Sequence, residues 1–576
     1  MDDCPRGTAG DYEQAARCVP AWDGPTRNRS PGEGDAPAES ALGTRLRRAT
    51  RLGGSLALST IGHGRLAIAC LLMVVLSTSG CTSLGEWWHN GFKVGPRYTP
   101  PPGPVAGQWI EAADPSVKHE PLQDCAWWTV FNDPALNRLI DTAYRQNLDL
   151  RIAGARILEA RAQRNIAVGN LFPQSQTAVL DFVDGQISKN IALPLNGHVG
   201  LWASGFNASW EADFWGRYRR IIETSDANLA ASVDSYGDAL VLLFSEVASN
   251  YVQLRTFEQR LQYARKNIEI QQGSLGLAED RFKKGVATEL DVRQARTNLA
   301  QTQSLIHPLE AGRRQASNRL CILLGMPTND LAGQLQPAPI PRAPVEVAIG
   351  LPADLLRRRP DVRHAERMVA AQSAQIGVAE ADLYPRLALN GFLGYAADDL
   401  RELFSPRSFT GIIVPTLQWN VLNYGRIANN IRLQDARLEE QSLLYQKAVL
   451  TAGREVEDSL VGFLEAQQQA IRLQESVQEA ERSVELVIIQ FRGGVTDFNR
   501  VYNTQTVMVT QQDQLATTEG DIALNLIGVY RALGGGWQCL MQGCDPPFTV
   551  TSLPSSVTAP TPAKAAEELP PPAGAK

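Results

Sequence analysis

The sequence predicts a mainly α-helical chain with four β-strands of membrane-barrel character, built as two copies of one unit. The middle of the chain is written twice, with matching motifs 209 to 212 positions apart. In each copy, 69 residues separate the glycine after the strand pair from the glycine at the next turn. Equal lengths are expected where many helices end in one plane, so the repeat predicts a tube wall rather than a pocket. The repeated motifs are Leu171-Phe172-Pro173 and Leu383-Tyr384-Pro385, Phe214-Trp215-Gly216-Arg217 and Asn423-Tyr424-Gly425-Arg426, and Phe282-Lys283-Lys284-Gly285-Val286 and Phe491-Arg492-Gly493-Gly494-Val495.

The start of the chain has the composition of an export segment. Residues 1–60 lack hydrophobic periodicity, and we expect a non-native or disordered leader that reflects a misplaced start codon. The apolar run 66–76 is too short to span a bilayer as a helix and suits a signal peptide over 61–80. The run ends at Gly80-Cys81 and resembles a bacterial lipoprotein signal, which predicts lipidation of Cys81; cleavage with a free thiol is the alternative. By the same resemblance, Thr82 in place of an aspartate favours the outer membrane.

Charge and cysteine content exclude some classes of protein. The net charge of −6 and the absence of a basic run in the body argue against a nucleic-acid partner. Of the eight cysteines, four remain once the leader is removed and Cys81 is lipidated, which is too few for a disulfide framework in so large a chain. Cys539 and Cys544 are close enough in sequence to form a local bridge, and Cys321 is expected to be a small core residue.

The elements before the first strands follow from proline positions. Prolines in Gly95–Pro102 forbid a helix interior or a central strand, so this stretch is expected to run extended along the surface. Asp133 is a plausible helix N-cap, with Pro134 at the favoured first helical position. A second helix covers 148–171 and is ended by Pro173.

Two segment pairs, 173–212 and 385–421, carry the strand signal. In the second pair one face is apolar and the other mostly polar, as in a membrane barrel with water inside; a soluble sandwich with one wet face is the alternative. The apolar face holds Leu387, Leu389, Leu393, Tyr395, Ile413, Leu417 and Trp419, and the other holds Arg386, Ala388, Asn390, Thr416, Gln418 and Asn420.

Four strands cannot close a barrel, because about eight strands make the smallest barrel whose interior fills well. An unpaired strand edge in lipid costs several kcal/mol per backbone group. The sequence therefore favours an oligomer. Three chains that together give a 12-stranded barrel are the natural solution, although the residues alone do not fix the number.

Each strand pair is followed by a helix of roughly 100 Å, at 1.5 Å per residue. After each glycine turn a coiled-coil seam of small and semi-polar residues is predicted, which permits close antiparallel packing. Pro308 is expected to kink the first returning helix. The predicted seam residues are Val292, Ala295, Leu299, Thr302 and Ile306 in the first copy and Val501, Thr504, Met508, Gln511 and Leu515 in the second.

These elements divide the exported chain into five segments. An extended N-terminal segment anchored by lipid covers 81–132. The first repeat covers 133–325 with its tip near 285, and the second covers 353–535 with its tip near 494. An equatorial segment, 326–352, joins the repeats, and 536–576 forms a second equatorial segment with a disordered tail.

Several motifs recur in a characteristic order and spacing, namely Trp127-Trp128-x-x-Phe131-x-Asp133-Pro134, Leu171-Phe172-Pro173, Trp210-Glu211-x-Asp213-Phe214-Trp215-Gly216-Arg217, Arg358-Arg359-Pro360-Asp361-Val362 and the two glycine turns. In this order and spacing, the chain resembles the outer membrane factors of the TolC and OprM type, in the NodT-like lipoprotein branch. The resemblance implies a trimeric channel with a 12-stranded barrel in the outer membrane and a helical tunnel across the periplasm. It also implies a periplasmic adaptor and an inner-membrane pump of the RND type as partners, drugs or other small solutes as cargo, and no cofactor.

The resemblance places two sites near the glycine turns, one that docks the adaptor and one that closes the lumen. Where the family has gate aspartates, the first copy has Asp291, but the second has Arg500 and Asn503, with Asp497 one turn earlier. We therefore expect Asp291 and Arg500 of neighbouring hairpins to form the closing pair, with a weakened cation preference. The alternative for the glycines is a purely structural role in a tight turn. The docking candidates are Lys283, Gly285, Val286, Arg492, Gly494, Val495 and Thr496.

Other classes of protein receive less support from the sequence. There is no phosphate-binding glycine loop, zinc-protease motif or nucleophile elbow, so neither an enzyme nor a metal site is predicted. A lipid-anchored periplasmic coiled-coil scaffold shares the long helices but does not need the alternating strand pairs. The exit duct of type I protein secretion is the nearer alternative. A duct makes few specific contacts with its cargo, so its own sequence does not distinguish the two.

Overall fold

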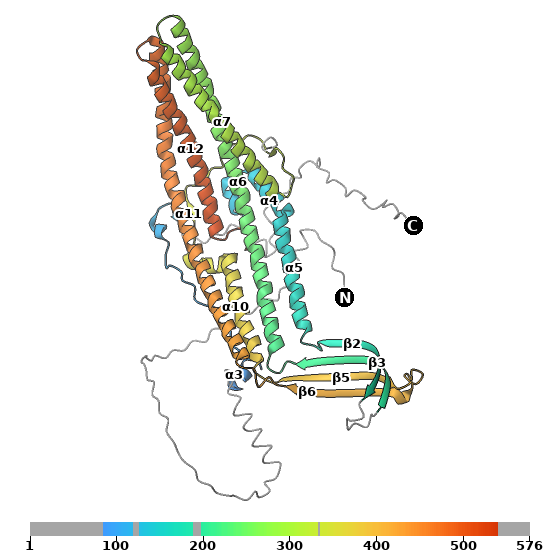
Figure 1. The fold of residues 1–576 in the computed structure, drawn as a ribbon. Coiled ribbons are helices and arrows are strands. Elements are labelled where there is room, and N and C mark those ends of the chain that lie inside the picture. Colours follow the sequence, from blue (N-terminus) through green and yellow to red (C-terminus); the bar gives the residue numbers. More distant parts are fainter. Residues whose placement is uncertain (1–83, 119–125, 188–196, 332–334, 539–576) are drawn as a thin grey trace, which may run out of the picture.

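The computed structural model describes residues 84–118, 126–187, 197–331 and 335–538. Long helices form a column, and a four-stranded sheet projects from one end of it (Figure 1). This arrangement confirms the predicted fold class of a mainly helical chain with four principal strands. The principal elements are α3 (Leu84–His89), α4 (Pro134–Gln146), α5 (Leu148–Gly169), β2 (Ser175–Ile187), β3 (Gly197–Ala212), α6 (Arg217–Lys283), α7 (Glu289–Leu323), α9 (Leu355–Arg358), α10 (Pro360–Ala381), β5 (Arg386–Ala397), β6 (Phe409–Gln418), α11 (Arg426–Gly493) and α12 (Phe498–Ala532).

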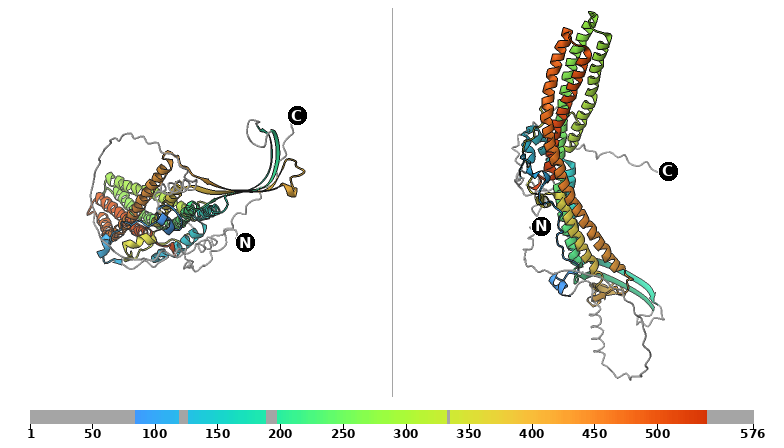
Figure 2. Two further views of the ribbon diagram at one scale, coloured as in Figure 1. Left: turned by 90° about the horizontal axis from the view of Figure 1, so that it is seen from below. Right: turned by 90° about the vertical axis from the view of Figure 1, so that its left-hand side faces the viewer.

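The sheet joins the two copies of the repeat. Its strands are antiparallel in the order β2-β3-β5-β6, so the hairpin of each copy meets the other where β3 pairs with β5. Figure 2 shows that the sheet curves as it leaves the helices. Opposed residues share a face, which gives one apolar face across all four strands. That face includes Ala178, Leu180, Phe182, Trp202, Phe206, Trp210, Leu387, Leu389, Leu393, Tyr395, Phe409, Ile413 and Leu417.

The opposite face of the sheet is mixed rather than uniformly polar. Ser209 donates a hydrogen bond to Asn390 Oδ1 (2.8 Å), and Asn390 Nδ2 donates to Thr416 (3.1 Å), which forms a polar ladder across three strands. Phe392, however, lies on the same face as this ladder, opposite Ile412. Strand β6 ends at Gln418, so the predicted strand residues Trp419 and Asn420 lie beyond it.

The two long helices have nearly equal lengths. Helix α6 has 67 residues and α11 has 68, while α7 and α12 have 35 each. Helices α7 and α5 lie one after the other along α6 (Figure 1). Pro308 lies inside α7, and the helix continues through it. Helix α10 packs against both α6 and α11.

The predicted coiled-coil seam is partly wrong in register. In α12 the buried residues are Val501, Gln505, Met508, Gln512 and Leu515, so Gln505 and Gln512 replace the predicted Thr504 and Gln511. In α7 the buried residue is Asn298 rather than Leu299. The buried positions of α12 still alternate by four and three residues, so the predicted heptad spacing is present and only its register differs.

The largest core lies where both copies meet the N-terminal segment. Trp127 stacks on Tyr530 (5.3 Å between ring centres), and Trp128 packs against Phe244. A short parallel pair, Val117–Lys118 with Val347–Ala348, ties the N-terminal segment to the link between the copies. Asp133 caps α4 as predicted, and Cys321 is buried and free. Cys81, Cys539 and Cys544 lie outside the described residues.

Residues 84–97, here called the strap, lie across α6 and α10. The guanidinium of Arg220 donates to the carbonyl oxygens of Val94, Gly95 and Pro96 at 2.9 to 3.0 Å. A Cβ at Gly95 would lie 2.4 Å from the Cα of Gly377, and Gly95 has a φ of +92°. A side chain at Gly95 would collide with the backbone at Gly377, so the strap can cross α10 this closely only because both residues are glycines.

Candidate functional site

Two hairpin turns form the end of the molecule farthest from the sheet (Figure 1). Tip 1, between α6 and α7, turns at Gly285, and tip 2, between α11 and α12, turns at Gly494. Their φ angles are +74° and +78°, in the left-handed region that favours glycine. No atom lies within 4 Å of a Cβ built on Gly285, so the backbone angle and not crowding accounts for glycine there.

All seven docking candidates lie at these two tips. Lys283, Gly285, Val286, Arg492, Gly494 and Val495 are exposed, and Thr496 is half-buried. Val286 and Val495 expose 59% and 80% of their surface, which is unusual for valine and leaves an apolar side chain on each tip. Within one chain, the docking candidates of tip 1 and tip 2 together form one exposed surface, to which both copies of the repeat contribute.

The four gate candidates lie just past the tips, and two of them serve as helix caps. Asp291 accepts hydrogen bonds from the backbone N–H and the hydroxyl of Thr288, both at 2.8 Å, in a capping box that starts α7. Asp497 caps α12 by accepting from the backbone N–H of Arg500 (3.2 Å). Arg500 and Asn503 are exposed. No ion pair joins Asp291 to Arg500 within the described part of the chain.

The sequence interpretation missed Arg281, which connects the two tips. Its Nη1 donates to the carbonyl of Arg492 (3.0 Å), and its Nη2 donates to the carbonyl of Val286 (3.4 Å). Its Cζ lies 5.0 Å from the centre of the Phe491 ring. Beneath it lies a small core, here called the tip cluster, that contains Ala278, Val292, Ala295, Val487, Phe491, Phe498 and Val501.

Buried amides connect the hairpins between the tip cluster and the large core. Gln505 donates to Ser274 Oγ (2.8 Å) and accepts from Asn298 (3.0 Å). Asn267 donates to Gln512 (2.8 Å). Because a buried amide needs partners, these contacts fix how α6 and α7 sit against α12.

Closer to the large core, the Arg-Arg-Pro-Asp motif carries a buried charge network. Arg359 donates to Asp361, to Glu455 and to the carbonyl of Ala532. Burial raises the pKa of Asp238 to about 6, and the neighbouring carboxylate of Asp361 adds to the effect. Burial likewise raises the pKa of Asp234 to about 6 although Arg363 lies 3.0 Å away, because burial disfavours the charged form.

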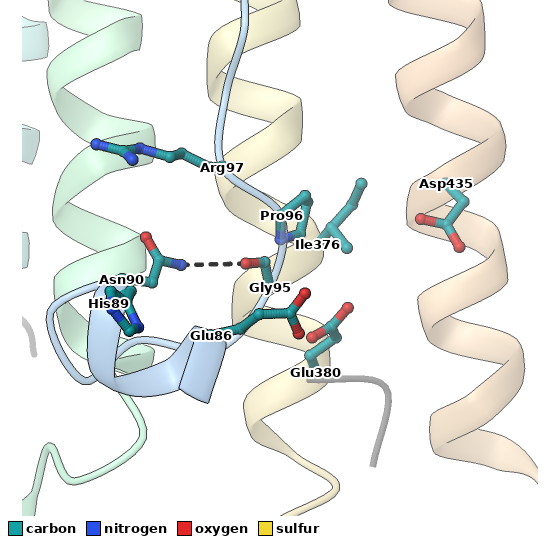
Figure 3. A pocket seen from close by; sticks show the side chains of 9 residues that line it. All are labelled: Glu86, His89, Asn90, Gly95, Pro96, Arg97, Ile376, Glu380 and Asp435. Carbon is teal, nitrogen blue, oxygen red and sulfur yellow. Dashed lines mark hydrogen bonds between the residues drawn. The ribbon is translucent and has the colours of Figure 1, made fainter. Parts of the chain in front are cut away.

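A cavity of about 440 Å³ lies beside the strap (Figure 3). The carboxylates of Glu86 and Glu380 face each other across it, and Asp435 projects from the opposite helix. Among the residues that the structure describes, no group of three or more acidic, His or Cys side chains is placed to hold a metal ion. We assign no ligand to this cavity.

Within the described residues, no helix combines the length and the apolar character needed to cross a bilayer.

The comparisons with known proteins agree with this architecture. The chain is similar to the pyoverdine export outer membrane protein OpmQ of Pseudomonas putida (30% identical, over 81% of this chain and 97% of the relative). It is also similar to the cation efflux system protein CusC of Escherichia coli (28% identical, over 78% and 96%). Among solved structures, the outer-membrane channel OprN matches with a TM-score of 0.74 at 31% identity, covering 77% of this chain and 99% of that one.

The family model described as outer membrane efflux protein matches residues 139–326 and 351–535, which are the two copies of the repeat. By their names, OpmQ is an outer membrane protein of pyoverdine export, CusC belongs to a cation efflux system and OprN is an outer-membrane channel. The chain therefore belongs to the outer membrane efflux protein family, and it is an efflux channel located in the outer membrane that extends into the periplasm.

Proposed function

We propose that three copies of this chain form the channel, and the internal repeat supports this proposal. Helix α10 of the second copy packs on α6 and on α11, whereas its first-copy equivalent, α5, packs on α6. The remaining side of α5 exposes large apolar residues, and so does α11. These are Leu148, Ile152, Leu158 and Ile166 on α5, and Leu433, Leu443, Leu444 and Leu450 on α11.

The way in which the two copies pack on each other within one chain predicts what covers these exposed surfaces of α5 and α11. If the contact between copies is repeated from chain to chain, α5 of one chain packs on α11 of the next, and β2 pairs with the β6 edge of its neighbour. Repeating the contact removes every open strand edge, which a sheet in lipid requires. Three chains then give the 12-stranded barrel that the fold class predicts.

We assign the tips to adaptor docking and the residues just past them to the gate. Val286 and Val495 offer apolar contacts on a polar rim that includes Lys283, Arg492 and Thr496. The closing pair remains Asp291 with Arg500 of a neighbouring chain, and Asp497 and Asn503 line the same level. The capping role of Asp291 is compatible with such a pair, because a carboxylate can accept several hydrogen bonds.

The cargo is a small solute delivered by an RND-type pump through its adaptor, and the channel carries out no catalysis. Relatives are named for export of pyoverdine, cations and toluene. This range supports a duct that takes its selectivity from the pump. Lipidation of Cys81 adds an anchor in the outer membrane just ahead of the strap. A protein-secretion duct remains the second candidate for the cargo class, and the identity of the captured pump would decide between them.

Site-specific photo-crosslinking in intact cells tests the docking assignment. A photoreactive residue replaces Lys283 at tip 1 or, as the matched control, Lys447, which is exposed on α11 far from the tips. We expect position 283 to capture a periplasmic adaptor together with its pump, and position 447 to capture neither. Capture of an adaptor at position 447 alone would contradict the tip assignment. Conductance of the purified protein in planar bilayers, together with a heat-sensitive trimer band, tests the channel itself.

The gate pair has its own test. Arg500→Ala is expected to raise the conductance of the resting channel and the leak of large antibiotics into cells. Arg500→Lys, which keeps the charge, is expected to preserve closure. If Arg500→Ala changed neither conductance nor leak, the pair would not be the gate.

A further inference from the structure

The face of the sheet that carries the polar ladder also carries three apolar side chains. Phe392 on β5 lies opposite Ile412 on β6, and Val414 follows two residues after Ile412, so the three share one face. Ile412 and Val414 expose 51% and 45% of their surface, and Phe392 is half-buried. Phe392, Ile412 and Val414 are here called the apolar patch.

Phe392 lies over a pair of glycines. Gly205 on β3 is opposite Gly394 on β5, and both belong to the same face as Phe392. A Cβ built on Gly205 would lie 3.0 Å from Cε2 of Phe392, and one built on Gly394 would lie 2.9 Å from its Cζ. The ring therefore leans along the sheet, over space that two side chains would otherwise fill.

The place of the apolar patch in the channel follows from the opposite face of the sheet. That face is apolar across all four strands and meets lipid in the proposed barrel. The face with the patch then lines the lumen, so every exported solute passes it. Within the described strands, the two rows of opposed residues that include the patch hold no charged side chain. These rows are Thr177, Asn207, Phe392 and Ile412, and Ser175, Ser209, Asn390 and Val414.

A water-filled barrel has no need of apolar side chains on its inner wall. An aromatic ring that covers glycines can stabilise strand pairing, which accounts for Phe392 but not for the exposure of Ile412 and Val414 beside it. Asn207 and Asn390 flank the patch in the same two rows. An aromatic and aliphatic surface with amides at its border suits a solute that has both an apolar ring and polar groups.

We propose that the apolar patch is a low-affinity contact site for amphiphilic small solutes that carry an aromatic ring. The proposal rests on the trimeric channel proposed above and concerns the chemical class of its cargo. In the trimer the patch recurs three times at one level of the lumen. The pump still selects the cargo, and the patch prolongs the contact of aromatic solutes with the wall without excluding other solutes.

Block of the channel current by two organic cations tests this assignment. Benzyltriethylammonium and tetraethylammonium have the same charge and differ by a phenyl group in place of a methyl group. Each is added to the purified protein in a planar bilayer, on the side of the sheet, and the concentration that halves the open-channel current is measured. Phe392→Ala removes the ring and Phe392→Tyr keeps it. Leu393→Ala, at the next position and on the lipid face, is the matched control.

We expect benzyltriethylammonium to halve the current of the parent at a concentration about two- to fivefold lower than tetraethylammonium does. The same preference is expected in Phe392→Tyr and in Leu393→Ala. Phe392→Ala is expected to lose it, with the block by tetraethylammonium unchanged. The current in potassium chloride alone should be the same in all variants, which separates loss of the contact from loss of the fold.

An equal block of the parent by both cations, or a preference that survives in Phe392→Ala, would overturn the assignment of the patch and leave the channel itself in place. A parent protein that passes no current would instead refute the proposed channel. If Phe392→Ala does not assemble, Phe392→Leu takes its place, because leucine still covers the glycines but has no ring. It too is expected to lose the preference, and a preference retained in Phe392→Leu would contradict the proposal.

Discussion

The middle of the molecule and its tip region are held together by different physical means. The middle contains one large aromatic and aliphatic core that includes Trp127, Phe244 and Tyr530. The tip region has a cluster of seven buried residues and a set of buried amides. Apolar burial contributes about 25 cal/mol per Å², whereas an amide hydrogen bond adds only about 1 kcal/mol net. The middle therefore contributes most of the free energy of folding. In the tip region, the two hairpins can be separated at a smaller cost in free energy.

Breaking the middle is expected to have the largest effect. Trp127 is 1% exposed, and Trp127→Ala is expected to lower the free energy of unfolding by about 3 to 5 kcal/mol, because it leaves a cavity against Tyr530. The measurement is the urea midpoint of the detergent-solubilised protein. Trp88, which is 65% exposed, is the control, and Trp88→Ala is expected to cost less than about 1 kcal/mol. Similar losses in both variants would place the stabilising core elsewhere.

An intermediate and local effect is expected in the tip region. Gln505→Leu leaves the buried polar groups of Ser274 and Asn298 without their partner, at a cost of about 1 to 3 kcal/mol. Hydrogen exchange should show faster exchange of α12 and α7 near the tips, with the protection of the large core unchanged. Val507→Ala, on the exposed side of the same helix, is the control. An equal loss of protection in the middle would mean that the two regions unfold as one.

The smallest expected effect is a pH dependence of stability that arises from a buried carboxyl in the middle of the molecule. Burial raises the pKa of Asp238 to about 6 from 3.8, so around pH 5 the folded chain binds a proton that the unfolded chain does not. This group therefore destabilises the fold most above pH 6, and its penalty decreases as the pH falls from 6 to 3.8 and is absent below 3.8. Asp238→Asn is expected to be more stable than the parent at pH 7.5, by on the order of 1 kcal/mol, and equal to it only near pH 3.

Thermal unfolding at the two pH values checks this prediction. Asp458→Asn, at an exposed carboxylate of α11, is the control and should show no such difference. If the parent were the more stable protein at pH 7.5, the Asp238 carboxylate would be stabilised by Arg359 and Arg531 rather than penalised by burial.

The large-scale plan of the molecule was predictable from the sequence because it is periodic. The glycine turns, the long helices and the alternating strands repeat at a fixed offset, and each copy supports the interpretation of the other. The capping role of Asp291 could also have been predicted from the sequence, because Thr288-x-x-Asp291 resembles a capping box. The domain bounds and the gate pair remain predictions.

Contacts across the seam were not predictable in the same way. The contact of Arg281 with Arg492 depends on which residues face each other between two hairpins, and no local pattern encodes that register. The one-residue errors at Gln505 and Gln512 have the same origin. The buried positions of α12 keep the heptad spacing, but the neighbouring hairpin decides which side of the helix they occupy.

The strap imposes an order on folding. Arg220, which holds the carbonyls of the strap, belongs to the first copy, and Gly377, against which Gly95 packs, belongs to the second. The seat of the strap is therefore complete only after α10 has been made and has packed on α6. Until then the strap can contact only its first-copy partners, which include Arg219, Arg220 and Glu223, and the crossing at Gly95 lacks its second side. The first described segment to be synthesised is thus fully enclosed only once the second copy has folded against it.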